Sequence, residues 1–196
     1  MSSDISGTSE TADDSITGVT LPRRVVTGER ADGRSIISSD EVVTDWTHRP
    51  TGLSVTEIWR ADALPVKANA DASGQPGVIA APAASGLAVR FAVFPPDHQI
   101  DAQGMADYEA SMKDLYGDQG TERPGNEIAG MHRTETVDIL TVVEGEIWSI
   151  MDEGEALLRK GDCMVQRGTR HAWRNRSDRP CTVVVVVLPA SLSQTE

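Results

Sequence analysis

The sequence predicts an all-β fold, a single antiparallel barrel or sandwich with extra strands on its N-terminal side and one short helix. Three observations carry this prediction. After Met131, short β-branched segments follow one another with glycine at the turns between them. The last of these segments, 182–188, contains five consecutive valines. Only one stretch of the chain has the apolar periodicity of a helix.

The chain begins with a segment that is unsuited to building a core. Residues 1–20 contain four carboxylates and no Lys or Arg, among many Ser, Thr and Gly residues. Such a composition is typical of disordered tails, and we expect an acidic tail here. The folded domain is expected over 21–190, with a short C-terminal tail over 191–196.

The first half of the domain is predicted to supply strands that pair onto the barrel. Segments 24–27, 34–38 and 54–60 are short, rich in β-branched residues and separated by Gly and Pro. Residues 61–86 are dominated by Ala, Gly, Pro and Ser and are expected to form a long loop. The alternating segment 87–94 then predicts a strand that ends at two prolines.

Residues 106–116 are predicted to form the helix, which ends at Gly117. Its apolar side chains recur at helical spacing: Met105, Tyr108, Met112 and Leu115. Two interpretations of this helix remain open. It packs its apolar stripe on the barrel wall, or it forms a lid over the barrel mouth together with the Gly-rich and Pro-rich segment 117–130.

The second half of the domain has the most regular pattern. Strands are predicted over the following segments, separated by turns at Gly145, Gly154 and Gly161: 136–143, 146–151, 156–159 and 163–166. An unbroken valine run such as 182–188 predicts a strand buried on both faces. Either a homodimer interface or a central position in the barrel accounts for that burial.

Composition limits the classes of partner. A chain of 196 residues with 39% apolar content is long enough for one domain with a core, and it has no apolar run of the roughly 18 residues that a membrane helix needs. The N-terminus lacks the basic start and apolar stretch of a signal peptide, so we expect a cytoplasmic location. The net charge of -12 disfavours nucleic acid and anionic membranes as partners. Cys163 and Cys181 are expected to be buried free thiols.

Two motifs near the C-terminus carry the chemistry. They are His132-x-Thr134-x3-Asp138-x6-Gly145 and Gly161-x6-Gly168-x2-His171-x3-Asn175. Together they resemble the paired motifs of the cupin superfamily, and the similarity implies a single cupin double-stranded β-helix, or jelly-roll barrel. The family pattern has a second histidine where Thr134 stands and a glutamate where Asp138 stands.

The resemblance implies a metal site built from His132, His171 and Asp138. Alternate strand residues point to the same face, so His132, Thr134 and Asp138 are expected to share one face, and barrel closure is expected to bring His171 beside them. Two imidazoles and a carboxylate can bind Fe, Mn, Ni or Zn and leave positions for substrate. Thr134 is a poor ligand and is expected to orient the substrate or a bound water.

The expected function is an enzyme that acts on a small oxygenated molecule, namely a carboxylate, keto or phenolic compound. A bound metal would assist decarboxylation, a lyase reaction, isomerisation or dioxygenation. One alternative is a metal-free isomerase, dehydratase or cyclase that uses Asp138 with His132 or His171 for proton transfer. Another is a non-catalytic protein that binds a small molecule. The fold alone does not choose among them.

Four further residues are predicted around the site. Trp173 has the parity of His171 and is expected to point inward, as core filling or as a wall on which substrate stacks. Arg170 and Arg167 lie within the second motif, and either one is suited to binding a substrate carboxylate bidentately. A solvated face or dimer ion pairs would equally explain these arginines. The resemblance implies that Asn175 is structural and supports the strand after His171.

Overall fold

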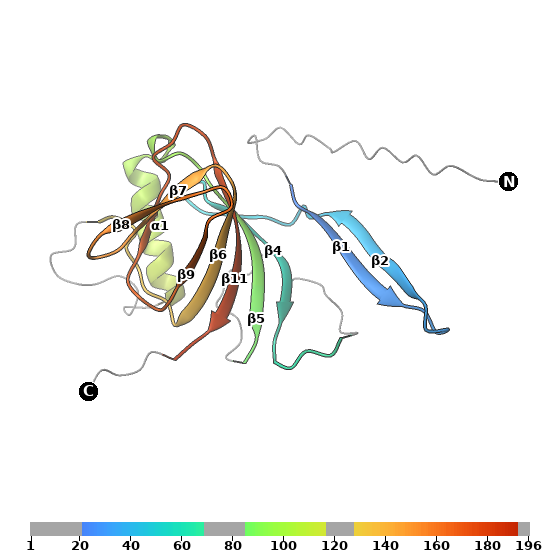
Figure 1. Cartoon of the computed structure of the whole chain (residues 1–196). Helices are drawn as coiled ribbons and strands as arrows, with labels where there is room; N and C mark the ends of the chain where they lie inside the picture. Colours follow the sequence, from blue (N-terminus) through green and yellow to red (C-terminus); the bar gives the residue numbers. More distant parts are fainter. Residues whose placement is uncertain (1–20, 69–84, 117–127, 192–196) are drawn as a thin grey trace.

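The computed structural model describes residues 21–68, 85–116 and 128–191. Most of the elements in these ranges are strands, which confirms the predicted all-β class (Figure 1). No helix within the described ranges is long and apolar enough to cross a membrane. In chain order the elements are β1 (Arg23–Glu29), β2 (Ser35–Val42), β3 (Thr47–His48), β4 (Ser54–Ala61), β5 (Leu87–Phe94), the 3-10 helix η1 (Asp97–Gln99), α1 (Ala102–Tyr116), β6 (Thr136–Glu144), β7 (Glu146–Ile150), β8 (Glu155–Arg159), β9 (Cys163–Gln166), β10 (Ala172–Arg174) and β11 (Cys181–Pro189).

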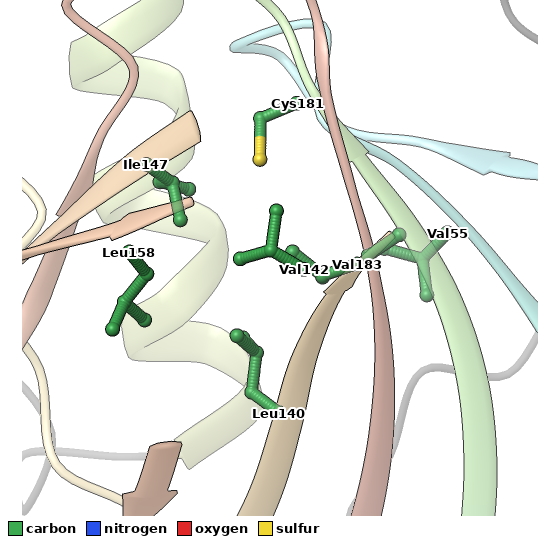
Figure 2. Close-up of a cluster of buried hydrophobic side chains, with 8 residues drawn as sticks. Val55, Leu140, Val142, Ile147, Leu158, Cys181 and Val183 are labelled. Carbon is green, nitrogen blue, oxygen red and sulfur yellow. The ribbon is translucent and has the colours of Figure 1, made fainter. Parts of the chain in front are cut away.

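Two antiparallel sheets enclose the core. One has six strands in the order β3-β4-β5-β11-β6-β9, and the other has three in the order β10-β7-β8. Apolar side chains from both sheets meet between them, and Figure 2 shows this cluster. Its buried members are Val55, Ala92, Leu140, Val142, Ile147, Leu158, Cys181 and Val183. Burial of these side chains from strands far apart in sequence holds the two sheets together.

Strand β11 is the central strand of the large sheet. It pairs with β5 on one side and with β6 on the other over nearly its whole length. Val183 and Val187 are buried, whereas Val184 and Val186 on the opposite face are only partly covered. The valine run therefore fits a strand that has neighbours on both edges and a core on one face.

The N-terminal strands differ from the prediction that all of them pair onto the barrel. Strand β4 does pair with β5. Strands β1 and β2 instead form a two-stranded sheet of their own, which projects from the barrel in Figure 1. A tight connection through Gly33, with φ of 81°, brings β2 back onto β1. Strands β1 and β2 are neighbours in sequence, so their pairing closes only a short loop and needs no strand of the barrel as a partner.

Helix α1 begins at Ala102, four residues before the predicted start. The side chain of Asp101 accepts a hydrogen bond from the backbone N–H of Gly104 at 2.7 Å, as an N-terminal cap does. The prediction relied on the spacing of apolar residues, which starts only at Met105, and so it did not include the cap residue Asp101. Most of the predicted loop 61–86 and of the predicted lid segment 117–130 lies outside the described residues.

The two cysteines have different surroundings. Cys181 is fully buried in the core, as predicted, and burial raises the pKa of its thiol to about 12. The prediction was wrong for Cys163, which is exposed. It pairs with Thr141 on the outer face of the β6–β9 edge, where its sulfur lies 3.2 Å from the threonine hydroxyl. Strand parity turns this thiol away from the core.

Candidate functional site

The structure brings His132 and His171 together. They form an antiparallel bridge in which the backbone N–H of each donates to the carbonyl of the other at 2.9 Å. Their ring centroids lie 4.4 Å apart, and the residues are only 8% and 3% exposed. Two imidazoles from segments 39 positions apart in sequence are thus fixed side by side inside the protein.

The hydrogen bonds of the two rings define where their lone pairs lie. Nδ1 of His132 is 2.9 Å from the carbonyl oxygen of Gly130, and Nδ1 of His171 is 2.9 Å from that of Thr169. A carbonyl only accepts, so each Nδ1 carries the proton and each Nε2 keeps a lone pair. Burial lowers the pKa of both rings, that of His171 to about 3 with a further contribution from His132. Both rings are therefore neutral at pH 7.

Gly130 links the His132 ring to helix α1. Its backbone has a φ of 72°, a left-handed conformation that favours glycine. Its N–H donates to Oε1 of Glu109 on α1 at 2.9 Å, while its carbonyl accepts from His132. The helix thereby fixes the peptide that orients one of the two imidazoles.

Asp138 lies on the inner face of β6, in phase with Leu140 and Val142. Burial raises the pKa of its carboxyl group, a hydrogen bond from Thr136 opposes that shift, and Oδ1 has no hydrogen-bond partner. Within the described ranges, no three His, Cys, Asp or Glu side chains come together as a set of metal ligands. Asp138 therefore does not complete a three-ligand set with the two histidines.

Thr134 contacts the aspartate only through an intermediate residue. Its hydroxyl lies 2.7 Å from that of Thr136, which in turn donates to Asp138. Thr136 is buried, yet the sequence analysis did not select it. Its position two residues before Asp138 on the same strand was the signal that it shares the inner face.

Trp173 points inward, as its parity predicted. It packs against the core, and its ring meets that of His171 edge to face, with centroids 5.8 Å apart at 76°. It also lines a pocket with Leu53 and Phe94, which pack on the core, and with Met105 and Tyr108 from α1. The first turns of α1 therefore line one side of this pocket.

The two candidate arginines are placed differently. Arg170 is mostly buried, forms an ion pair with Asp152 at 3.4 Å, and is close enough to His132 to contribute to the lowered pKa of that ring. One of its terminal nitrogens, Nη2, is buried without a partner. Arg167 is exposed. Of the two, only Arg170 is therefore positioned beside the histidine pair.

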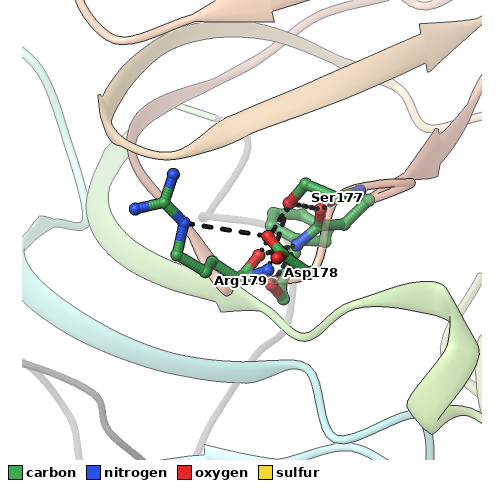
Figure 3. Close-up of polar contacts among 5 residues, drawn as sticks. Ser177, Asp178 and Arg179 are labelled. Carbon is green, nitrogen blue, oxygen red and sulfur yellow. Dashed lines mark hydrogen bonds and ion pairs between the residues drawn. The ribbon is translucent and has the colours of Figure 1, made fainter.

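Asn175 supports the strand that carries Trp173. Its side-chain amide donates to the carbonyls of Phe94 at 3.0 Å and Arg179 at 2.8 Å. Its side-chain oxygen accepts from both the N–H and the hydroxyl of Ser177. Figure 3 shows the turn from Ser177 to Arg179. These bonds tie the end of β5 to the segment between β10 and β11.

The sequence analysis also missed a charged cluster on the inner face of the large sheet. Arg90 donates from Nε and Nη2 to Oε1 of Glu57 at 3.2 and 2.9 Å, and Arg60 donates to the same oxygen at 2.8 Å. The signal was present in β5, where Arg90 stands between the small residues Ala88 and Ala92 at inward-facing positions.

Comparisons with known proteins identify the same region. Residues 121–187 match the family model described as Cupin domain (Cupin_2). Phomopsin biosynthesis cluster protein C' of Diaporthe leptostromiformis is 55% identical over 56 residues, which cover 28% of this chain and 29% of the relative. The cupin-domain-containing oxidoreductase virC of Hypocrea virens is 45% identical over 51 residues, 26% of either chain. The matches thus span less than a third of these relatives.

Solved structures with detectable likeness are distant. A Cupin 2 conserved barrel domain protein from Salinispora arenicola has 15% identity and a TM-score of 0.38, covering 71% of this chain and 78% of its own. A putative ethanolamine utilization protein Q from Salmonella typhimurium has 13% identity and a TM-score of 0.40, covering 88% of this chain and 100% of its own.

Proposed function

Because the chain contains a cupin domain, we propose that it is a small-molecule enzyme whose reaction centre is the His132–His171 pair with a divalent metal ion. One observation carries the proposal. Both buried rings are held by backbone carbonyls at Nδ1, which leaves two neutral Nε2 lone pairs in one place. Metal-binding histidines are oriented in the same way, by a hydrogen bond from the nitrogen that does not bind the metal.

The donor chemistry of the pair fits Fe, Mn, Ni or Zn. Two imidazoles would supply two ligands, and water and substrate oxygens would supply the others. When bound, such an ion polarises a carbonyl or enolate oxygen or binds dioxygen. The chain's own residues orient the substrate. Trp173 offers an aromatic wall beside His171, and Arg170 offers a positive charge with one unpaired nitrogen near His132.

The substrate class that we propose is a carboxylate, keto or phenolic compound from a biosynthetic pathway. Two relatives are named as products of the phomopsin and oryzines biosynthesis clusters, and others are named cupin-domain-containing oxidoreductases. These names support a biosynthetic role. For each of the reactions considered, namely decarboxylation, lyase, isomerase and dioxygenase reactions, the proposal places a substrate oxygen between the histidine pair and Arg170.

Metal titration tests this proposal. Metal-free protein should bind Co²⁺ with a stoichiometry of one and show the visible absorption of the ligated ion. We expect His132→Ala and His171→Ala to weaken binding at least about 100-fold, since each removes one of two protein ligands. His98→Ala is the matched control because His98 is exposed on η1. Equal Co²⁺ affinity in all four proteins would exclude the histidine pair as the metal site.

A metal-free acid–base enzyme is the second candidate, and the environment of Asp138 favours it. A buried carboxyl group with a raised pKa and a hydroxyl donor is suited to proton transfer. Such an enzyme would keep its turnover after chelation and lose it in Asp138→Asn. A metal enzyme would show the opposite pattern on chelation.

We also infer that the chain forms a homodimer. The outer face of the large sheet exposes Ile139 and Val165, which are 40% and 59% exposed and lie opposite each other on β6 and β9. The projecting β1–β2 hairpin exposes Val25, Ile37 and Val42 on one face. A two-stranded hairpin alone is marginally stable in water, so a second copy that covers this apolar surface would stabilise both. Light scattering after size exclusion should give twice the monomer mass, and a monomer mass at micromolar concentration would refute the inference.

A further inference from the structure

The inner face of the large sheet is divided into an apolar half and a polar half. At one end, Val55, Ala92, Val142 and Val183 belong to the core. Toward the other end the same inward positions carry polar residues. The pairing register places five of these positions in one row across the strands, in the order Arg60, Ala88, Val187, Asp138 and Gln166.

This row has the profile of a trough. The small residues Ala88 and Val187 occupy its middle, on β5 and β11. Arg60 stands on one side, and Asp138 with Gln166 stands on the other. Since the strands of a barrel curve around its interior, side chains at the two ends of such a row lean toward each other. Long polar side chains therefore face one another across a floor of small ones.

The charges on the Arg60 side are already compensated in part. Glu57 faces Arg90 in the neighbouring row and binds both Arg90 and Arg60 through its Oε1. The side chains of Glu57, Arg90 and Arg60 are only 5%, 9% and 13% exposed. Two guanidinium groups share one carboxylate, and electrostatic attraction to Arg90 reaches Asp138 across the trough. The trough therefore has no large excess of either charge.

Four polar atoms of the trough have no hydrogen-bond partner. With Asp138 ionised, three of them are acceptors: Oε2 of Glu57, Oδ1 of Asp138 and Oε1 of Gln166. The fourth is a donor, Nε of Arg60. A buried polar group without a partner costs about 1–3 kcal/mol, so unpartnered atoms on one face of the sheet indicate a site that a ligand or water completes. Acceptors outnumber donors here, so the missing partner must bring hydrogen-bond donors.

We propose that this trough binds a neutral, donor-rich group of the substrate, namely a carboxamide or a pair of hydroxyls. A carboxylate would bring only acceptors and would face three unpartnered oxygens. An ammonium group would bring donors but would meet the guanidinium groups of Arg60 and Arg90. An amide N–H₂ or a diol supplies donors to Glu57 and Gln166, and its oxygen accepts from Arg60. The proposal deepens the proposed function, on which it rests for the identity of the trough as part of a substrate site.

Benzamide and benzoate are matched probes, since they have the same ring and differ in the amide and carboxylate groups. Binding is followed in metal-free full-length protein by the Nε–H signals of ¹⁵N-labelled arginine, with the Arg60 signal assigned from the Arg60→Lys variant. We expect benzamide, and likewise catechol, to shift the Arg60 signal saturably. Benzamide should bind at least about tenfold more tightly than benzoate, which corresponds to one or two net hydrogen bonds.

Two variants test the donor preference directly. In Glu57→Gln the amide oxygen should keep the two arginines and turn the N–H₂ group to the position of Oε2, which converts an unpartnered acceptor into a donor. In Asp138→Asn the hydrogen bond from Thr136 should likewise turn the amide N–H₂ to the position of Oδ1. We expect the benzamide preference to reverse in Glu57→Gln and to fall about tenfold in Asp138→Asn. Asp138→Asn leaves the ion pairs of Glu57 with Arg60 and Arg90 intact. It therefore still tests the donor preference if Glu57→Gln does not fold.

Three outcomes would overturn the proposal. They are benzoate binding as tightly as benzamide to the wild-type protein, no saturable shift with any of the three probes, and an unchanged preference in the folded variants. The probes are used without metal, whereas the proposed function is tested with Co²⁺ and the histidine variants. If the probes do not bind as expected, the Co²⁺ titration still tests the proposed function. If Co²⁺ does not bind at the histidine pair, the probe experiments still test the trough.

Discussion

Replacing Asn175 with alanine should destabilise the protein by roughly 2–4 kcal/mol. The side chain is 2% exposed and forms four hydrogen bonds, two as donor and two as acceptor. Its loss leaves the carbonyl of Phe94 without its amide donor and leaves the Ser177 hydroxyl as the side-chain donor to the carbonyl of Arg179. Each unsatisfied buried group costs about 1–3 kcal/mol, and relaxation or an entering water recovers part of the sum.

Urea unfolding followed by tryptophan fluorescence measures this loss. Ser177→Ala is the matched control, because it removes only a hydroxyl that donates to Asn175 and Arg179 in the same turn, and we expect it to cost less than about 1 kcal/mol. A loss below about 1 kcal/mol in Asn175→Ala, or an equal loss in both variants, would show that the amide does not hold β10 in place.

The remaining predictions concern a carboxyl group, the thiols and the outer sheet face. Because the native pKa of Asp138 is raised, the native state keeps a proton that the unfolded state has released, so wild-type stability should fall as pH rises above about 4. Urea titrations should show that Asp138→Asn lacks this fall. Ellman's reagent should modify Cys163 on the outer sheet face in the monomeric protein, and it should modify Cys181 only after unfolding, since the second thiol is buried. Val165→Lys should convert the dimer to monomer in light scattering without changing the fold, and Lys160→Ala is an exposed control.

The sequence was sufficient to predict the C-terminal half of the fold because its signals are local. Turns at Gly145 and Gly161 require positive φ, which the structure has at 76° and 93°. Shared parity with His171 placed Trp173 on the core side, and shared parity with His132 placed Asp138 on the inner face of β6. Such patterns depend on neighbours one or two residues away, and a single sequence contains them in full.

The incorrect predictions have a common physical origin. Parity along a strand does not say which face meets the core, so Cys163 was assigned to the interior although its strand turns it outward. Nor does a β-branched segment specify its partner strand, so β1 and β2 were expected on the barrel.

The charged trough illustrates this limit most clearly. An arginine within an alternating strand, such as Arg90, is expected to face solvent, because burying an unpaired charge is costly. Glu57 on β4, 33 positions earlier in the chain, compensates this charge, and the pairing of β4 with β5 brings the two together. Replacing such a buried ion pair with apolar residues often costs a protein no stability, so stability alone does not explain why the barrel keeps it. The buried Arg90–Glu57 ion pair and the unpartnered oxygens near it are therefore better explained by a role in ligand binding than by a role in stability.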